Sequence, residues 1–162
     1  MKLKLKIKNY KSSRFAIKIH NGFTVVELLI YMALLTIFLL VLLDVFTTTL
    51  NFKLQSEATS ALNQDSRSIL GNLNYNIYNS GTATIVSSSK LSLDSGTKVY
   101  ELSGGNLLLN SVKLNSLDTK VDSITFTKIG QTIQITFTLE SLITTSGGPR
   151  TQTMNTTLGL RY

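Results

Sequence analysis

The 162-residue sequence contains no cysteine, and its one histidine, His20, lies near the amino terminus. Without cysteine the chain has neither disulfides nor thiolate ligands, so an exported domain would depend on its hydrophobic core alone. Residues after His20 lack both residue types that dominate transition-metal binding and nucleophile–base catalysis. We therefore predict neither an enzyme nor a cofactor-binding protein.

Charge of either sign is scarce after the first 22 residues. The formal net charge is +7, but seven of the sixteen lysine and arginine residues lie in residues 1–22, which contain no acidic residue. The remaining nine are balanced by nine aspartate and glutamate residues. Residues 23–162 are therefore formally neutral and lack the basic patch expected of a nucleic-acid-binding domain.

A long apolar run follows the basic segment. Glu27 is the only charged side chain between Phe23 and Asp44, and residues 28–43 contain none. A helix of this length crosses the ~30 Å hydrocarbon core of a bilayer. An acidic side chain costs roughly 2.5–3.5 kcal/mol at the middle of such a helix, and less near its end. Glu27 therefore needs a positive partner, and a new amino terminus at Phe23 is the nearest candidate.

The stretch Gly22-Phe23-Thr24-Val25-Val26-Glu27-Leu28-Leu29, after a basic leader and before an apolar helix, resembles the type IV prepilin signal. This family includes type IV pilins, pseudopilins of type II secretion and pilin-like proteins of DNA-uptake machines. The resemblance implies cleavage between Gly22 and Phe23 by a prepilin peptidase and methylation of the Phe23 amine. It also implies assembly into a helical filament through Glu27, with Thr24 as a helix cap or subunit contact.

The same resemblance implies partners and a location. The partners are other pilin or pseudopilin subunits, an assembly ATPase and a membrane platform, with nucleic acid only in a DNA-uptake system. The chain would span the cytoplasmic membrane once, with its amino terminus inside and its carboxyl-terminal domain outside, and then enter the filament. The order of a long helix, a meander sheet and a last strand resembles that of minor pseudopilins, so the resemblance implies a minor pilin or minor pseudopilin.

Two other hypotheses on function remain. The first is a pilin-like module that captures DNA, a surface or a secreted substrate, although the neutral mature chain argues against DNA binding. A plain single-pass anchor with an unrelated extracytoplasmic domain is the second. An ordinary secretory signal fits less well, because its apolar core is about 7–15 residues and ends at a small-x-small cleavage site.

The pattern predicts an α+β fold in which one long helix packs on an antiparallel sheet. Apolar residues recur at three- and four-residue steps after Asp44, so we expect one helix from about Thr24 to Tyr78 that stops at Asn79-Ser80-Gly81. Alternating apolar and polar residues with Gly-containing turns then predict an antiparallel meander. The expected strands are 82–87, 91–94, 98–102, 106–110, 122–129, 132–141 and 152–161.

These elements predict four segments: a removed leader at residues 1–22, a membrane or filament-core helix at 23–43, its amphipathic continuation at 44–80, and a sheet domain at 81–162. The loop Ser146–Arg150 is expected to be a long hairpin connection or, alternatively, a contact loop. Asp118 and Asp122 with Asn115 could bind Ca²⁺, but solvated turn carboxylates explain them better, and we predict no metal site.

Overall fold

The structure is a computed structural model and describes residues 24–161. Its first element is the helix α1 (Val25–Tyr78), and eight strands follow. The chain divides after Leu42 into two compact units. In the first unit the side chains from Leu28 to Leu42 are all exposed, and they form an apolar helical surface. The predicted bounds of the helix are confirmed to within one residue.

The second unit contains the rest of α1 and all the strands. A five-stranded antiparallel sheet is formed by β1 (Ala83–Ser87), β2 (Lys90–Leu93), β3 (Lys98–Ser103), β4 (Asn106–Leu109) and β5 (Val112–Lys113), in that order. A short 3₁₀ turn, η1 (Asp94–Gly96), joins β2 to β3. A three-stranded antiparallel sheet is formed by β6 (Thr119–Ile129), β7 (Thr132–Ser141) and β8 (Thr151–Gly159). The predicted α+β class is confirmed.

The strands divide into two sheets, whereas the sequence predicted one meander. The edge of β6 meets the five-stranded sheet through single hydrogen bonds, from the Phe126 N–H to the Ser88 carbonyl (2.8 Å) and from the Val121 N–H to the Gly105 carbonyl (2.8 Å). The Lys128 ammonium donates to the Ala83 carbonyl of β1 at 2.9 Å. These isolated bonds connect the sheets without forming a continuous ladder.

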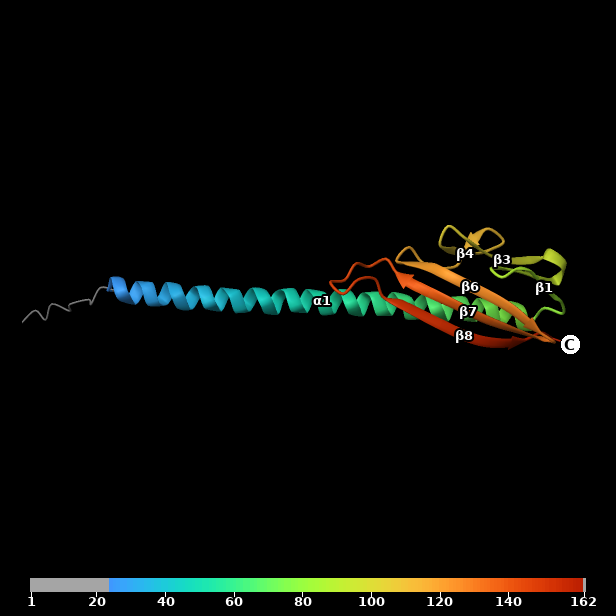
Figure 1. Ribbon diagram of the computed structural model, residues 1–162, viewed down its shortest axis with the longest axis horizontal. Coiled ribbons are helices and arrows are strands. Elements are labelled where there is room, and N and C mark those ends of the chain that lie inside the picture. The colour runs from blue at the N-terminus through green and yellow to red at the C-terminus, as the bar shows by residue number, and fades with distance from the viewer. Residues whose placement is uncertain (1–23, 162) are drawn as a thin grey trace, which may run out of the picture. The chain divides into compact units, whose positions relative to one another are not determined.

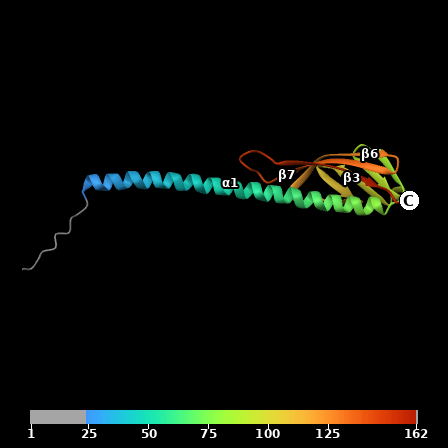
Figure 2. The ribbon, with the colours of Figure 1, turned by 90° about the horizontal axis from the view of Figure 1, so that it is seen from below.

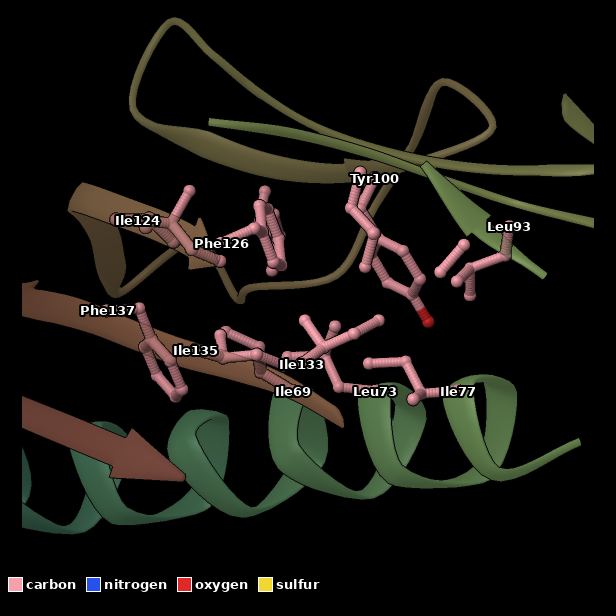
Figure 3. Close-up of a cluster of buried hydrophobic side chains, with 14 of the residues drawn as sticks. Ile69, Leu73, Ile77, Leu93, Tyr100, Ile124, Phe126, Ile133, Ile135 and Phe137 are labelled. Atoms are coloured by element: carbon pink, nitrogen blue, oxygen red, sulfur yellow. The ribbon is translucent and has the colours of Figure 1, made fainter. Parts of the chain in front are cut away.

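Both sheets lie on one side of the carboxyl-terminal part of α1 (Figure 1 and Figure 2). The helix buries Ile69, Leu73 and Ile77 against side chains of both sheets (Figure 3). The clearest alternation predicted from sequence is confirmed in β7, where Ile133, Ile135, Phe137 and Leu139 are fully buried. The predicted helix stripe is confirmed from Ala58 onward, but Leu50 is 45% exposed.

Helix α1 ends at the predicted place by a different device. Gly81 was expected to follow the helix as a glycine cap, but its φ is not in the left-handed region. Instead, the Asn79 side-chain amide donates to the Tyr75 carbonyl (2.8 Å) and the Ser80 hydroxyl donates to the Asn76 carbonyl (2.6 Å). The Ser80 hydroxyl thus satisfies a carbonyl of the last helical turn, and the Asn79 amide adds to the bond that the Asn79 N–H already makes to the Tyr75 carbonyl.

Candidate processing and assembly site

The first turn of α1 is held by Thr24. Its hydroxyl oxygen accepts the Glu27 backbone N–H at 3.2 Å, and its carbonyl accepts the Leu28 N–H at 3.1 Å. This is the geometry of an N-cap residue, and Thr-x-x-Glu is the spacing of a capping box. Thr24 therefore fixes where the helix starts. Gly22 and Phe23, the predicted cleavage and methylation residues, lie outside the described residues.

The Glu27 carboxylate lies in the first turn of α1, where the helix dipole favours a negative charge. The Tyr31 hydroxyl donates to Glu27 Oε1 at 3.3 Å from one turn further along. Tyr31 was missed from the sequence, although its four-residue spacing from Glu27 places both on one helix face. The helix thus supplies Glu27 with a neutral hydrogen-bond donor, and no described residue forms a salt bridge with it.

The apolar surface continues beyond this turn. Within residues 24–161, α1 is the one helix that is long and apolar enough to cross a membrane by length and composition. The apolar part of this helix is not buried by other residues of the described chain. The Thr36 hydroxyl donates to the Met32 carbonyl at 2.8 Å, so this polar group is satisfied within the helix, as an apolar surrounding requires.

Asp118 and Asp122 were expected to be solvated turn carboxylates, with Ca²⁺ binding alongside Asn115 as the alternative. Asp118 and Asp122 are exposed, whereas the Asn115 side chain is buried and accepts the Leu107 N–H at 3.1 Å. Asn115 also donates to the Thr119 carbonyl at 2.8 Å, so its amide serves the loop before β6. Over residues 24–161, no group of three or more His, Cys, Asp or Glu side chains is placed to bind a metal ion.

Asp65 is an acidic residue of α1 that lies among the polar residues between the apolar positions of the predicted helix stripe. That placement predicts an exposed side chain, but only 6% of Asp65 is exposed. Its Oδ2 atom accepts the Ser116 N–H and the Ser116 hydroxyl, each at 2.8 Å, and the Thr119 hydroxyl. None of the salt bridges among residues 24–161 involves Asp65. Its three hydrogen bonds therefore compensate its burial and attach the segment around Ser116 and Thr119 to α1.

The chain is thus of the α+β class, with antiparallel sheets on the later part of its helix. The apolar start of that helix, with an acid in its capped first turn, fits membrane anchoring. Residues 17–43 match the family model described as the prokaryotic N-terminal methylation motif. The match supports a likeness to the type IV pilin and pseudopilin family in this amino-terminal segment. No curated protein and no solved structure matches it.

Proposed function

We propose that this chain is a structural subunit, a minor pilin or pseudopilin, of a filament that serves as a type IV pilus, in type II secretion or in DNA uptake. A prepilin peptidase cleaves between Gly22 and Phe23, and the Phe23 amine is methylated. The subunit then leaves the membrane and enters the filament through the apolar half of α1. The observation that carries the proposal is the position of Glu27, an acid inside the motif and one turn into an exposed apolar helix.

The role of Glu27 follows from its surroundings. The carboxylate has a tyrosine hydroxyl and the helix dipole beside it, and neither supplies a full positive charge. In lipid or in a filament core, a carboxylate is stabilised strongly only by a cation. The Phe23 amine of a neighbouring subunit provides that cation, and the pairing sets the axial position of one subunit on the next.

The apolar surface of α1 supports the same proposal. Leu28 to Leu42 present exposed side chains around the helix, so the helix has no polar face for water. In the membrane, lipid covers this surface; in the filament, the same helices of other subunits replace the lipid. The basic leader keeps the amino terminus in the cytoplasm by the positive-inside rule, and residues 81–162 form the domain outside. An assembly ATPase and a membrane platform act as the machinery.

Cleavage is tested by replacing Gly22 with leucine and by determining the amino terminus of the membrane-extracted chain. The wild-type chain should begin with Phe23, methylated or not, and the G22L variant should remain a full-length precursor because a bulky side chain prevents the close approach of the peptidase. H20L is the matched control, since it places the same bulk two residues earlier and should be processed. A wild-type chain that begins with Met1, or normal processing of G22L, contradicts the proposal.

Assembly is tested by E27Q, which keeps the size of the side chain and the Tyr31 contact but removes the charge. E27Q should be cleaved normally and remain in the membrane, with its recovery in sheared filaments reduced at least about tenfold, a loss equivalent to ~1.4 kcal/mol. The control E57Q removes a charge from an exposed side chain of the same helix and should assemble normally. If E27Q enters filaments as well as the wild type, the charge pairing is wrong.

A further inference from the structure

Strand β8 leaves one backbone edge of the three-stranded sheet open. The sheet order is β6-β7-β8, so β8 is paired on one side only. The Ser141 N–H donates to the Arg150 carbonyl and the Leu160 N–H to the Gln131 carbonyl, which fixes the alternation of the β7–β8 ladder. Even-numbered residues of β8 therefore bond to β7. The outward N–H and C=O groups belong to Thr151, Thr153, Asn155, Thr157 and Gly159.

This edge lacks the devices with which proteins normally protect edge strands. Residues 151–160 contain no charged residue and no proline. The register from Thr132↔Gly159 to Glu140↔Thr151 is continuous, without a bulge. The residues whose backbone points outward also have exposed side chains. A long, flat, uncharged edge is a template for another strand.

Other edges of the described part of the chain are short or already occupied. Strand β5 has two residues and ends at Lys113. The outer edge of β6 bonds to Ser88 and Gly105, and the Lys128 ammonium occupies the Ala83 carbonyl at the edge of β1. Among residues 24–161, β8 is thus the long edge that carries neither of these protections.

Space is available beside β8. One hollow is lined by Thr59, Leu62 and Asn63 of α1 together with Arg150–Gln152. A second is lined by Leu70, Gly71 and Asn74 of α1 with Thr156 and Leu158. Gly71 contributes to this space, because a Cβ there would meet nothing within 4 Å. The linings are uncharged apart from Arg150, so a neutral segment with alternating small polar and apolar residues fits them.

We propose that β8 is a docking edge for an extended, uncharged segment of a different subunit, which adds as a strand to the β6-β7-β8 sheet. The inference rests on the proposed function, because it names a contact between subunits of the filament. Strand addition supplies affinity through main-chain hydrogen bonds and specificity through alternate side chains.

The occupant is a different subunit because a second copy has no suitable partner strand. Described residues 24–161 offer no second long open edge to pair with β8. Antiparallel pairing of two β8 strands conflicts with anchoring, and parallel pairing, which is the less stable ladder, is the outcome that the cross-linking test below detects. The strand runs in the same direction as α1, since Gln152 contacts Asn63 and Leu158 lies beside Leu70. Antiparallel β8 strands would therefore direct the α1 segments of two membrane-anchored copies in opposite directions.

The test compares amide hydrogen exchange at Thr153, Asn155 and Thr157 in assembled filaments and in the detergent-solubilised subunit. Docking should slow exchange of these three amides at least about tenfold in filaments. The variant N155P removes an outward N–H without breaking a β7–β8 bond, and N155A keeps that N–H. N155P should be cleaved normally but lose at least nine-tenths of its incorporation, and N155A should incorporate normally. T153K/T157K adds two charges to the exposed face of β8 and should lose incorporation to the same extent as N155P. This double variant keeps the test valid if the proline of N155P prevents folding.

The outcomes separate this inference from the proposed function. Wild-type filaments that form while these amides exchange as fast as in the free subunit would overturn the docking edge and leave the filament function standing. N155P and T153K/T157K that incorporate like N155A would do the same. A wild-type chain that forms no filaments would overturn both. T153C introduces the only thiol of the chain, to which a photoreactive maleimide is attached before the filaments are illuminated. A cross-linked product of twice the chain mass would overturn the different-subunit assignment, and a product of another mass supports it.

Discussion

Replacing Asp65 should destabilise the sheet domain more than replacing any exposed acid. In D65A, the Ser116 N–H, the Ser116 hydroxyl and the Thr119 hydroxyl lose their acceptor. Hydrogen bonds to a charged group contribute about 1.5–3 kcal/mol each, but removing the carboxylate also removes its own burial cost. We expect a net loss of about 2–4 kcal/mol, because Thr119 is only 1% exposed and water replaces the acceptor poorly.

The smaller change D65N separates the charge from the shape. An asparagine oxygen still accepts these donors, but the bonds lose the charge that roughly doubles their strength, so we expect a loss of about 1–2 kcal/mol. The matched control is D122A, since Asp122 is exposed and its loss should stay within about 0.5 kcal/mol.

The assay is thermal unfolding of the full chain in detergent, followed by the near-ultraviolet circular dichroism of tyrosine, because the chain contains no tryptophan. For a domain of this size, 1 kcal/mol shifts the Tm by about 3–5 °C, so D65A should lower it by on the order of 10 °C. If D65A unfolds within 2 °C of D122A, about the shift that 0.5 kcal/mol produces, then the hydrogen bonds of Asp65 do not stabilise the domain.

Two further predictions concern the contact between α1 and the sheets. The Tyr100 hydroxyl accepts from the Asn76 amide at 2.7 Å and donates to the Asn72 carbonyl at 3.1 Å, so Y100F should cost about 1–3 kcal/mol in urea unfolding. Burial raises the pKa of Tyr100 above its ordinary 10.0, outweighing the bond from Asn76. The contribution of Tyr100 to the free energy of unfolding is therefore present below pH 10 and is lost as the pH rises through the raised pKa. Above pH 10 the free energy of unfolding of the wild type should fall more steeply with pH than that of Y100F. Equal pH dependence of the two proteins would contradict this. L73A should cost about 2–5 kcal/mol because Leu73 is fully buried, whereas L50A should stay within about 0.5 kcal/mol; similar losses would place the core elsewhere.

Features set by neighbours in sequence were predictable. The three- and four-residue recurrence of apolar positions located α1, and the Gly-containing turns separated the strands, with Gly104, Gly105 and Gly130 at positive φ. The bounds of β7 were predicted as observed, because its alternation is regular along its whole length. The first turn of α1 was equally accessible, since Thr24 and Glu27 contact each other over three residues.

Features set by distant residues were not predictable in the same way. The division into two sheets depends on how β6 meets Ser88 and Gly105, which no local pattern encodes. The burial of Asp65 depends on Ser116 and Thr119, which lie more than fifty residues along the chain. Residue type alone indicated a solvated carboxylate, because acids are seldom buried unless they are paired or hydrogen-bonded. Strand β5 was missed because its two residues give no alternation.

Three polar residues on the buried stripe of α1 have a consequence for how the helix is positioned. A stripe of leucine and isoleucine alone would fit the sheets nearly as well after sliding by one helical turn, ~5.4 Å, because such side chains are interchangeable. Asp65 accepts hydrogen bonds from Ser116 and Thr119. Ser66 bonds to Gln152, and Asn76 bonds to Tyr100. A shift of the helix along the sheets would leave the Asp65 carboxylate and the Asn76 amide buried without these hydrogen-bond partners. The polar contacts therefore fix the axial position of α1 on the sheets, and a force along the helix axis must break them before the helix can slide.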